Sequence, residues 1–189
     1  MSLTVDMSFD TREATRFLRL LGQKGVREAT RRALNKAAAQ TKTQASKSIR
    51  QKRNLKARVV NGQLKVLKAN RRRLNAAVQA TGRPIPLIEY GGKTKAIPGN
   101  HRRQFSAEVD KGKRKVVKGA FVATVGGISS AFERKGSKRL PIRTLYGPSL
   151  PSTFLKDEIV RAMRTKVRQV YPRLLSHEVE REISKAGRR

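Results

Sequence analysis

The sequence predicts an α+β fold: a long N-terminal helix over residues 10–50, a basic region with a central antiparallel β-sheet over 51–140, a proline-rich link over 141–152 and C-terminal helices over 153–186. Apolar residues recur at helical spacing near both ends of the chain. Short runs with strand-like alternation fill the middle, separated by glycine and proline. Acidic residues gather toward the ends, and none lies between Glu28 and Glu89. A length of 189 residues favours one domain, spanning 1–189.

The N-terminal helix is expected to begin at Asp10 or Thr11, either of which can cap it. Gly22 and Gly25 interrupt its first turns. After them, residues of one helix face are mostly small: Val26, Ala29, Ala33, Ala37, Thr41, Ala45 and Ile49. Small side chains let a neighbouring backbone approach closely, so we interpret this face as a packed seam rather than a lipid-binding face.

Cations line the opposite face of the same helix. They are Arg31, Arg32, Lys36, Lys42, Lys47 and Arg50. Such a ridge is either a solvated helix surface or a contact for a polyanion or an acidic partner. The residues alone leave both interpretations open.

The segment after the first helix gives mixed signals. Asn61-Gly62 between apolar runs is a strong hairpin signal, but residues 51–58 could equally extend the helix, so both remain open. Residues 74–80 resemble a strand. Residues 91–103, rich in Gly, Lys, Pro, Asn and Arg, predict a loop.

Later strands are better marked. Residues 105–109 alternate, Lys111-Gly112 forms a turn, and 115–117 return. Gly126-Gly127 separates 120–125 from 128–132, which predicts a second hairpin. We expect all these strands to form one antiparallel sheet.

The C-terminal helix is expected to begin at Ser152 or Thr153, with Asp157 and Glu158 placed favourably in its first turns. Pro172 lacks the backbone donor that the helix needs. We therefore predict a kink there, with residues 173–186 packing as a separate short element.

Net charge limits the classes of function. The chain has 45 Lys and Arg against 13 Asp and Glu, a formal charge of +32. Self-repulsion of that size excludes an ordinary free-standing monomer unless a polyanion or acidic partner neutralises it. Cysteine is absent, which excludes disulfides and cysteine-based zinc sites. No signal peptide and no membrane-spanning segment is expected.

Catalytic patterns are weak. His177 begins a sequence that would need a second histidine four residues later to bind zinc, where the chain has Arg181. The glycine pairs lack the spacing of a phosphate-binding loop, and no Gly-x-Ser-x-Gly motif occurs. We expect neither an enzyme nor a cofactor or metal.

The candidate contact residues are cations that the sequence places at strand ends and in loops. They are Arg71, Arg72, Arg73, Arg102, Arg103, Lys113, Arg114 and Lys115. Three interpretations remain open: contact with DNA, contact with acidic neighbouring proteins, or solvated loop charges. The composition alone resembles that of ribosomal proteins, so a ribosomal or other RNA-binding structural protein is the alternative function.

One stretch carries a resemblance to a known family. Gly119-Ala-Phe-Val-Ala and its hairpin lead to Phe132-Glu-Arg-Lys-Gly-Ser-Lys-Arg-Leu-Pro-Ile142. Gly147-Pro-Ser-Leu-Pro and an amphipathic helix broken by Tyr171-Pro172 follow. This order resembles the minor tail protein Z family of long-tailed bacteriophages and prophages, which includes the lambda-type tail completion proteins.

The resemblance implies a virion component at the head-proximal end of the tail, made in the cytoplasm of the bacterial host. Such a protein completes the tail, helps to join it to the head and is needed to place the genome end. Tail symmetry implies a homo-hexameric ring. The implied partners are tail-tube, tail-terminator or connector proteins and the phage DNA end.

Overall fold

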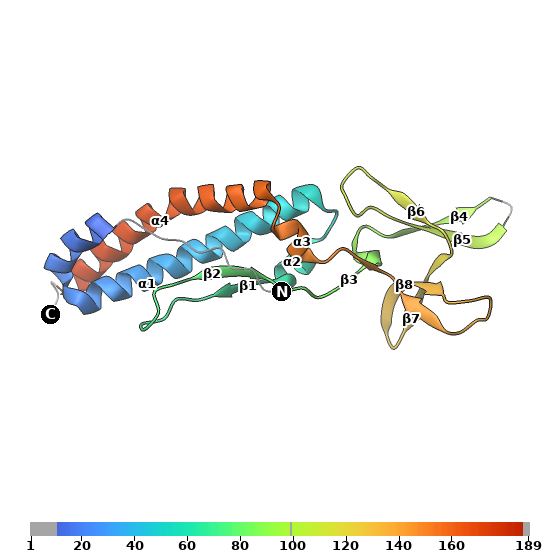
Figure 1. Cartoon of the computed structure of the whole chain (residues 1–189), viewed down its shortest axis with the longest axis horizontal. Coiled ribbons are helices and arrows are strands. Elements are labelled where there is room, and N and C mark those ends of the chain that lie inside the picture. The colour runs from blue at the N-terminus through green and yellow to red at the C-terminus, as the bar shows by residue number, and fades with distance from the viewer. Residues whose placement is uncertain (1–10, 99, 187–189) are drawn as a thin grey trace.

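Two long helices lie side by side with a two-stranded sheet along them and form one half of an elongated molecule, and the other small β-sheets form the other half (Figure 1). The computed structural model describes residues 11–98 and 100–186, with side chains from residue 22 onward except those of 100–102. Helix α1 spans Thr11–Lys52 and α4 spans Asp157–Ala186. The described part of α1 starts at Thr11, and Asp10, the other expected cap, lies outside the described residues.

The small-residue seam of α1 is confirmed. Ala29, Ala33, Ala37 and Ala45 have no exposed surface, and Ile49 is equally buried. The apolar residues of α4 that share these clusters are Ile159, Met163, Val167 and Val170. Gly22 breaks the helix as expected, because its φ of 64° and ψ of 166° are not helical. The second expected interruption is wrong, because Gly25 lies within the helix.

Helix α4 continues through Pro172 as one element, so the prediction of a separate element over 173–186 is wrong. Figure 1 shows the axis of α4 changing direction about halfway along, which fits the donor that proline lacks. After the proline, Leu174 and Leu175 pack against the cluster that contains Ala33 and Ala37 of α1. Glu178 also pairs with Lys36, so the second half of α4 stays on the helix pair. The expected caps Ser152 and Thr153 lie instead in a separate short helix, α3 (Leu150–Phe154).

Residues 53–80 form a short helix and a hairpin. Helix α2 (Ala57–Gln63) contains Asn61-Gly62, so the hairpin turn does not lie there. Strand β1 (Leu64–Leu67) pairs antiparallel with β2 (Ala77–Ala80). Val60 and Leu64 are buried in the same core cluster, which favours the helical path over a turn at Asn61-Gly62.

The remaining strands are short. They are β3 (Ile85–Pro86), β4 (Lys93–Ile97), β5 (Asn100–Ala107), β6 (Lys115–Val117), β7 (Ala120–Val125), β8 (Ile128–Arg134), β9 (Ile142–Thr144) and β10 (Tyr146–Gly147), with a 3-10 turn η1 at Leu87–Glu89. The predicted loop at 91–103 is wrong, because β4 and β5 pair across most of it. Every residue of β4 is exposed, so no apolar alternation marks the strand in the sequence.

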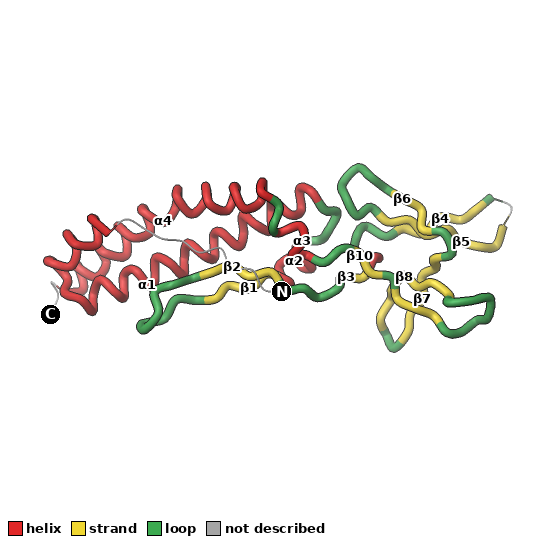
Figure 2. Tube along the Cα trace, in the orientation of Figure 1, coloured by secondary structure: helices red, strands yellow, loops and turns green. Residues whose placement is uncertain are grey.

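In the described part of the chain, four small sheets replace the single expected sheet. Their orders are β1-β2, β10-β3, β4-β5-β6 and β7-β8-β9. Figure 2 shows the strands grouped in separate patches joined by loops. The predicted hairpins at Lys111-Gly112 and Gly126-Gly127 are confirmed, and Val125 pairs with Ile128 across the second. The expected link at 141–152 contains β9, β10 and the start of α3, because it returns to pair with β8 and β3.

The sheets meet the helices around Tyr90, which is 1% exposed. Its hydroxyl donates to the carbonyl of Pro148, and the ring packs on Gly147. A Cβ at Gly147 would lie 2.8 Å from Cδ2 of Tyr90. This position therefore accepts no side chain without movement of the ring.

Gly147→Ala is expected to lower the free energy of unfolding by about 2 kcal/mol, because the added methyl group overpacks a buried aromatic ring. Urea denaturation at high salt measures the change. Gly136→Ala is the matched control, since a Cβ there meets nothing within 4 Å. Equal effects of the two substitutions would show that the Tyr90 contact is not tight.

Candidate cationic interfaces

Most carboxylates whose side chains are described already pair with cations of the same chain. The paired ones are Glu28, Glu108, Asp110, Glu133, Glu158, Glu178 and Glu182. Because these few acids are used internally, the surplus of lysine and arginine lies on the surface. The distribution of this surplus defines the candidate interfaces.

The tightest of these groups joins the two long helices. Glu178 of α4 has no exposed surface, and the Nζ of Lys36 pairs with its Oε1. Nη1 of Arg32 and Nη1 of Arg181 each lie 3.8 Å from its Oε2. Burial opposes ionisation of Glu178, yet the hydrogen bond from Lys36 and the nearby cations hold its pKa below the ordinary value.

Glu28 of α1 is a second internal anion. Arg31 Nη2 lies 2.6 Å from its Oε1, Arg32 Nε lies 3.1 Å from the same atom, and Arg71 Nε lies 3.7 Å from Oε2. The hydrogen bond from Arg31, with these charges, lowers the pKa of Glu28 from 4.5 to about 2. Three residues of the predicted cationic ridge, Arg31, Arg32 and Lys36, therefore pair with acids of the same chain.

Arg71, Arg72 and Arg73, here called the arginine turn, lie in the loop between β1 and β2. Oδ1 of Asn70 accepts hydrogen bonds from the backbone amides of Arg72 and Arg73, at 3.0 and 2.7 Å. The amide of Asn35 both donates to and accepts from the backbone of Ala69. These bonds fix the backbone of the turn on α1 while all three arginines remain exposed.

The other predicted residues lie in the β4-β5-β6 sheet. Lys113 and Lys115 are exposed at the turn between β5 and β6, and Arg103 is exposed on β5. Arg114 is tied down: its Nη1 donates to the carbonyl of Gly91 at 3.0 Å, and its Nη2 lies 3.1 Å from Glu108. Arg114 therefore braces the sheet, and the side chain of Arg102 lies outside the described part.

The structure separates the predicted residues into two groups. Figure 1 shows the β1–β2 loop alongside the helix pair, whereas β5 and β6 lie in the β-sheet half. A single contact surface made of all eight residues is therefore not present in one subunit.

Sequence reasoning missed a third basic surface. A groove of about 870 Å³ runs between the β4-β5-β6 and β7-β8-β9 sheets, and its cations are Arg103, Lys118 and Arg134. The guanidinium of Arg134 lies over the ring of Phe121, 5.0 Å from its centroid. Both new cations flank the uncharged stretch from Gly119 to Phe132, and that bracketing is the sequence signal that could have revealed them.

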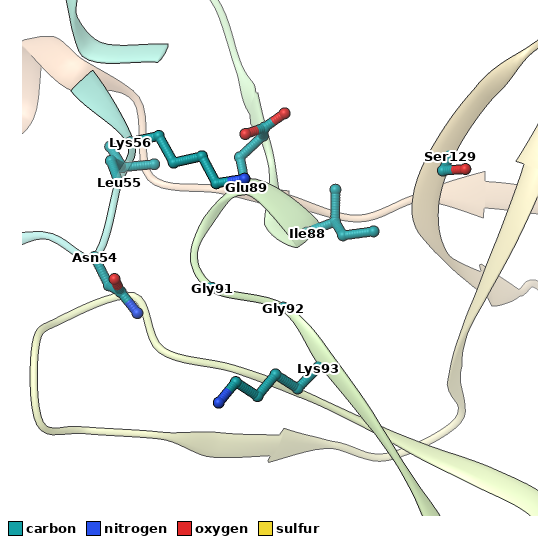
Figure 3. A pocket seen from close by; sticks show the side chains of 9 residues that line it. All are labelled: Asn54, Leu55, Lys56, Ile88, Glu89, Gly91, Gly92, Lys93 and Ser129. Atoms are coloured by element: carbon teal, nitrogen blue, oxygen red, sulfur yellow. The ribbon is translucent and has the colours of Figure 1, made fainter. Parts of the chain in front are cut away.

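A smaller hollow of about 430 Å³ lies beside Gly91 and Gly92. Figure 3 shows Asn54 on one side of Gly91 and Gly92, Ile88 on the other and Lys93 below them. A Cβ at Gly92 would lie 2.9 Å from the backbone of Ile88, so the glycine serves close packing. Backbone amides do not converge here at a helix start, as they do in a phosphate-binding loop.

The side chains of the described residues form no group of three or more possible metal ligands. His177 is exposed on α4, beside the buried Glu178. No helix of the described residues is long and apolar enough to cross a membrane. The α+β fold, the internally paired acids and the exposed cations together indicate a basic structural protein that works within an assembly.

The chain belongs to the prophage minor tail protein Z (GPZ) family, whose profile matches residues 11–188. It is thus a structural protein of the phage tail and not an enzyme. Its partners lie among the phage tail proteins, and the ribosomal alternative is set aside. No curated protein and no solved structure is significantly similar to the chain.

Proposed function

We propose that this protein completes the head-proximal end of the tail, where it helps to join the head and to position the genome end. In this proposal six copies form a ring next to the tail-tube, tail-terminator or connector proteins. The observation that carries the proposal is the arginine turn, whose backbone is fixed by Asn35 and Asn70 while its three side chains stay exposed. A preformed group of cations suits a permanent anionic partner.

A ring of such subunits would concentrate positive charge around the channel through which DNA passes. Neutralising phosphates releases counterions, which gives affinity without sequence preference. The competing partner within the same proposal is an acidic surface on a neighbouring tail protein. In either case the partner reduces the self-repulsion that +32 charges impose on the free subunit.

Deletion of the gene from its phage, with complementation from a plasmid, tests the placement. We expect tails of normal length that do not attach to heads, or that attach and fail to deliver DNA. Antibody labelling of complemented particles should mark the head-proximal end by electron microscopy. Label at the distal tip, or normal infection without the gene, would contradict the proposal.

The isolated chain is expected to be poorly compact or prone to aggregate at low salt and to become compact as salt rises, because screening weakens the repulsion between its cations. Circular dichroism and sedimentation velocity across a salt series measure this. A well-folded monomer that is indifferent to salt would count against the need for a neutralising partner.

A further inference from the structure

The free edges of the two three-stranded sheets differ in charge. Strands β4, β6 and β9 each contain a lysine or arginine. Strand β7 spans Ala120–Val125 at the edge of its sheet and contains no charge and no proline. Charged residues on an edge strand discourage pairing with another chain. Strand β7 is thus the edge left open in a chain where repulsive charges are abundant.

The outer edge of β7 pairs with no other strand of the described structure, and two apolar side chains of β7 are exposed. Within the described structure, its backbone hydrogen bonds to other strands all go to β8, and β5 lies near β7 without such a bond. Val122 is 38% exposed and Val125 is 52% exposed. An edge of six residues with these properties is a template for one additional strand.

The groove beside β7 indicates which residue types the added strand should contain. Its lining combines apolar side chains with cations: Ile97, Val117, Phe121, Arg103, Lys118 and Arg134. Among the described residues, none of these three cations forms an ion pair. Glu133, the acid in the same lining, pairs with Arg143. A segment that fits should alternate apolar and polar residues and carry acids.

Residues 3–9 of this chain have that pattern. Leu3, Val5, Met7 and Phe9 alternate with Thr4, Asp6 and Ser8, and Asp10 follows. Residues 1–11 contain two acids and no cation, although the whole chain has a net charge of +32. A strand formed by these seven residues would be one residue longer than the six of β7. These residues precede the described part of the structure.

The segment cannot reach β7 of its own subunit. Figure 1 shows α1 beginning at the end of the molecule away from the sheets, with β7 beyond its other end. The part of α1 after Gly22 is about 45 Å long at 1.5 Å per residue. Val5 lies six residues before Thr11 and extends at most about 21 Å from it. Only another subunit can therefore supply the segment.

We propose that residues 3–9 of one subunit pair as an added strand with the β7 edge of a neighbouring subunit, with Asp6 or Asp10 meeting the groove cations. This inference rests on the proposed ring, in which each copy both donates and accepts a segment. Head-to-tail contacts of this kind form a closed ring when the rotations between successive subunits add up to one full turn.

Disulfide cross-linking tests the pairing directly, because the native chain has no cysteine. A Val5→Cys chain is mixed with chains that carry one cysteine at each position of 121–125 in turn. We expect links with alternate positions only, since successive side chains of a strand point to opposite faces. Equivalent cysteines at positions 93–97 of β4 are the control and should form no link.

A second variant separates pairing from chance collision. Met7→Pro in the Val5→Cys chain should abolish the link, because proline removes a backbone donor, whereas Met7→Leu should retain it. Since the segment lies outside the described core, neither change is expected to unfold the subunit. A link that survives Met7→Pro would overturn the proposal.

The mass of the native oligomer, measured in parallel by sedimentation, separates the two levels of the argument. A multimer without a link from position 5 to β7 would overturn strand exchange and leave the ring intact. A third outcome is that the β7 cysteines form no link to position 5 and lose their reactivity only when the protein binds to tails. That result would assign the β7 edge to another tail protein and would also overturn strand exchange. A chain that stays monomeric both alone and on tails would contradict the ring itself.

Discussion

Replacing both Arg32 and Lys36 by methionine is expected to lower the free energy of unfolding by about 3 kcal/mol, at the lower end for a buried charge that loses its partners. The two substitutions leave the carboxylate of Glu178 with no exposed surface and with Arg181 as its remaining cation, 3.8 Å away. The loss should be larger than that of Glu178→Gln, because Arg32 and Lys36 are partly exposed and remain hydrated when the acid is gone.

Urea denaturation at high salt measures this difference. Lys42→Met with Lys47→Met is the matched control, since it removes the same charge and neither lysine has an ion pair among the described residues. Adding Glu178→Met to the Arg32→Met and Lys36→Met chain should restore part of the stability, because the unpaired buried charge is removed. The loss of the Arg32 pairs with Glu28 and Glu182 remains. If the triple variant is as unstable as the double one, packing and not charge explains the loss.

The same acids predict how stability depends on pH. The pKa of Glu28 is about 2 instead of 4.5, and the pKa of Glu178 is also lowered. Both carboxylates therefore stabilise the folded state at pH values above the ordinary pKa of glutamate. That contribution is lost as pH falls from 4.5 toward 2. In the Arg32→Met and Lys36→Met chain, burial should dominate and raise the pKa of Glu178. Protonation then relieves the buried charge, so the deficit against the native protein should shrink as pH falls.

Elements with strong local patterns could be predicted from the sequence. The alanine seam of α1 follows from helical spacing, and the β7–β8 turn follows from Gly126-Gly127, where both φ values are positive. Tertiary contacts overrode weaker signals. Asn61-Gly62 lies in α2, where Val60 and Leu64 enter the core. Helix α4 continues past Pro172, where Leu174 and Leu175 pack against the α1 cluster. The exposed strand β4 has no apolar period to detect.

The candidate surfaces were predictable only as residue types. Sequence identified the arginine turn but not the bonds from Asn35 and Asn70 that fix it, because those bonds join residues far apart in the chain or within an irregular loop. It also grouped the arginine turn with Lys113 and Lys115, which the fold places in its other half. Arg114 proved to be a structural brace, since its partner Glu108 faces it only once β5 and β6 pair.

Charge reversal in the arginine turn is expected to abolish delivery of DNA by assembled tails. Arg72→Glu with Arg73→Glu is the better test, because Arg71 lies 3.7 Å from Glu28 and its reversal would add repulsion within the subunit. If these arginines contact DNA, duplex binding should weaken equally for all sequences. The slope of log affinity against log salt should fall by about 1.8, or about 0.9 for each lost phosphate contact.

Lys113→Glu with Lys115→Glu makes the same change of charge in the sheet half and is the matched control. A reduced slope with the arginine-turn variant alone would place the DNA contact on the helix half of the subunit. Equal reductions would indicate that net charge, not position, governs binding. The opposite outcome is that the arginine-turn variant binds DNA normally and fails to attach to tails. Arg72 and Arg73 would then lie at a protein interface, where they neutralise acidic surfaces of tail proteins, and the DNA assignment would be dropped.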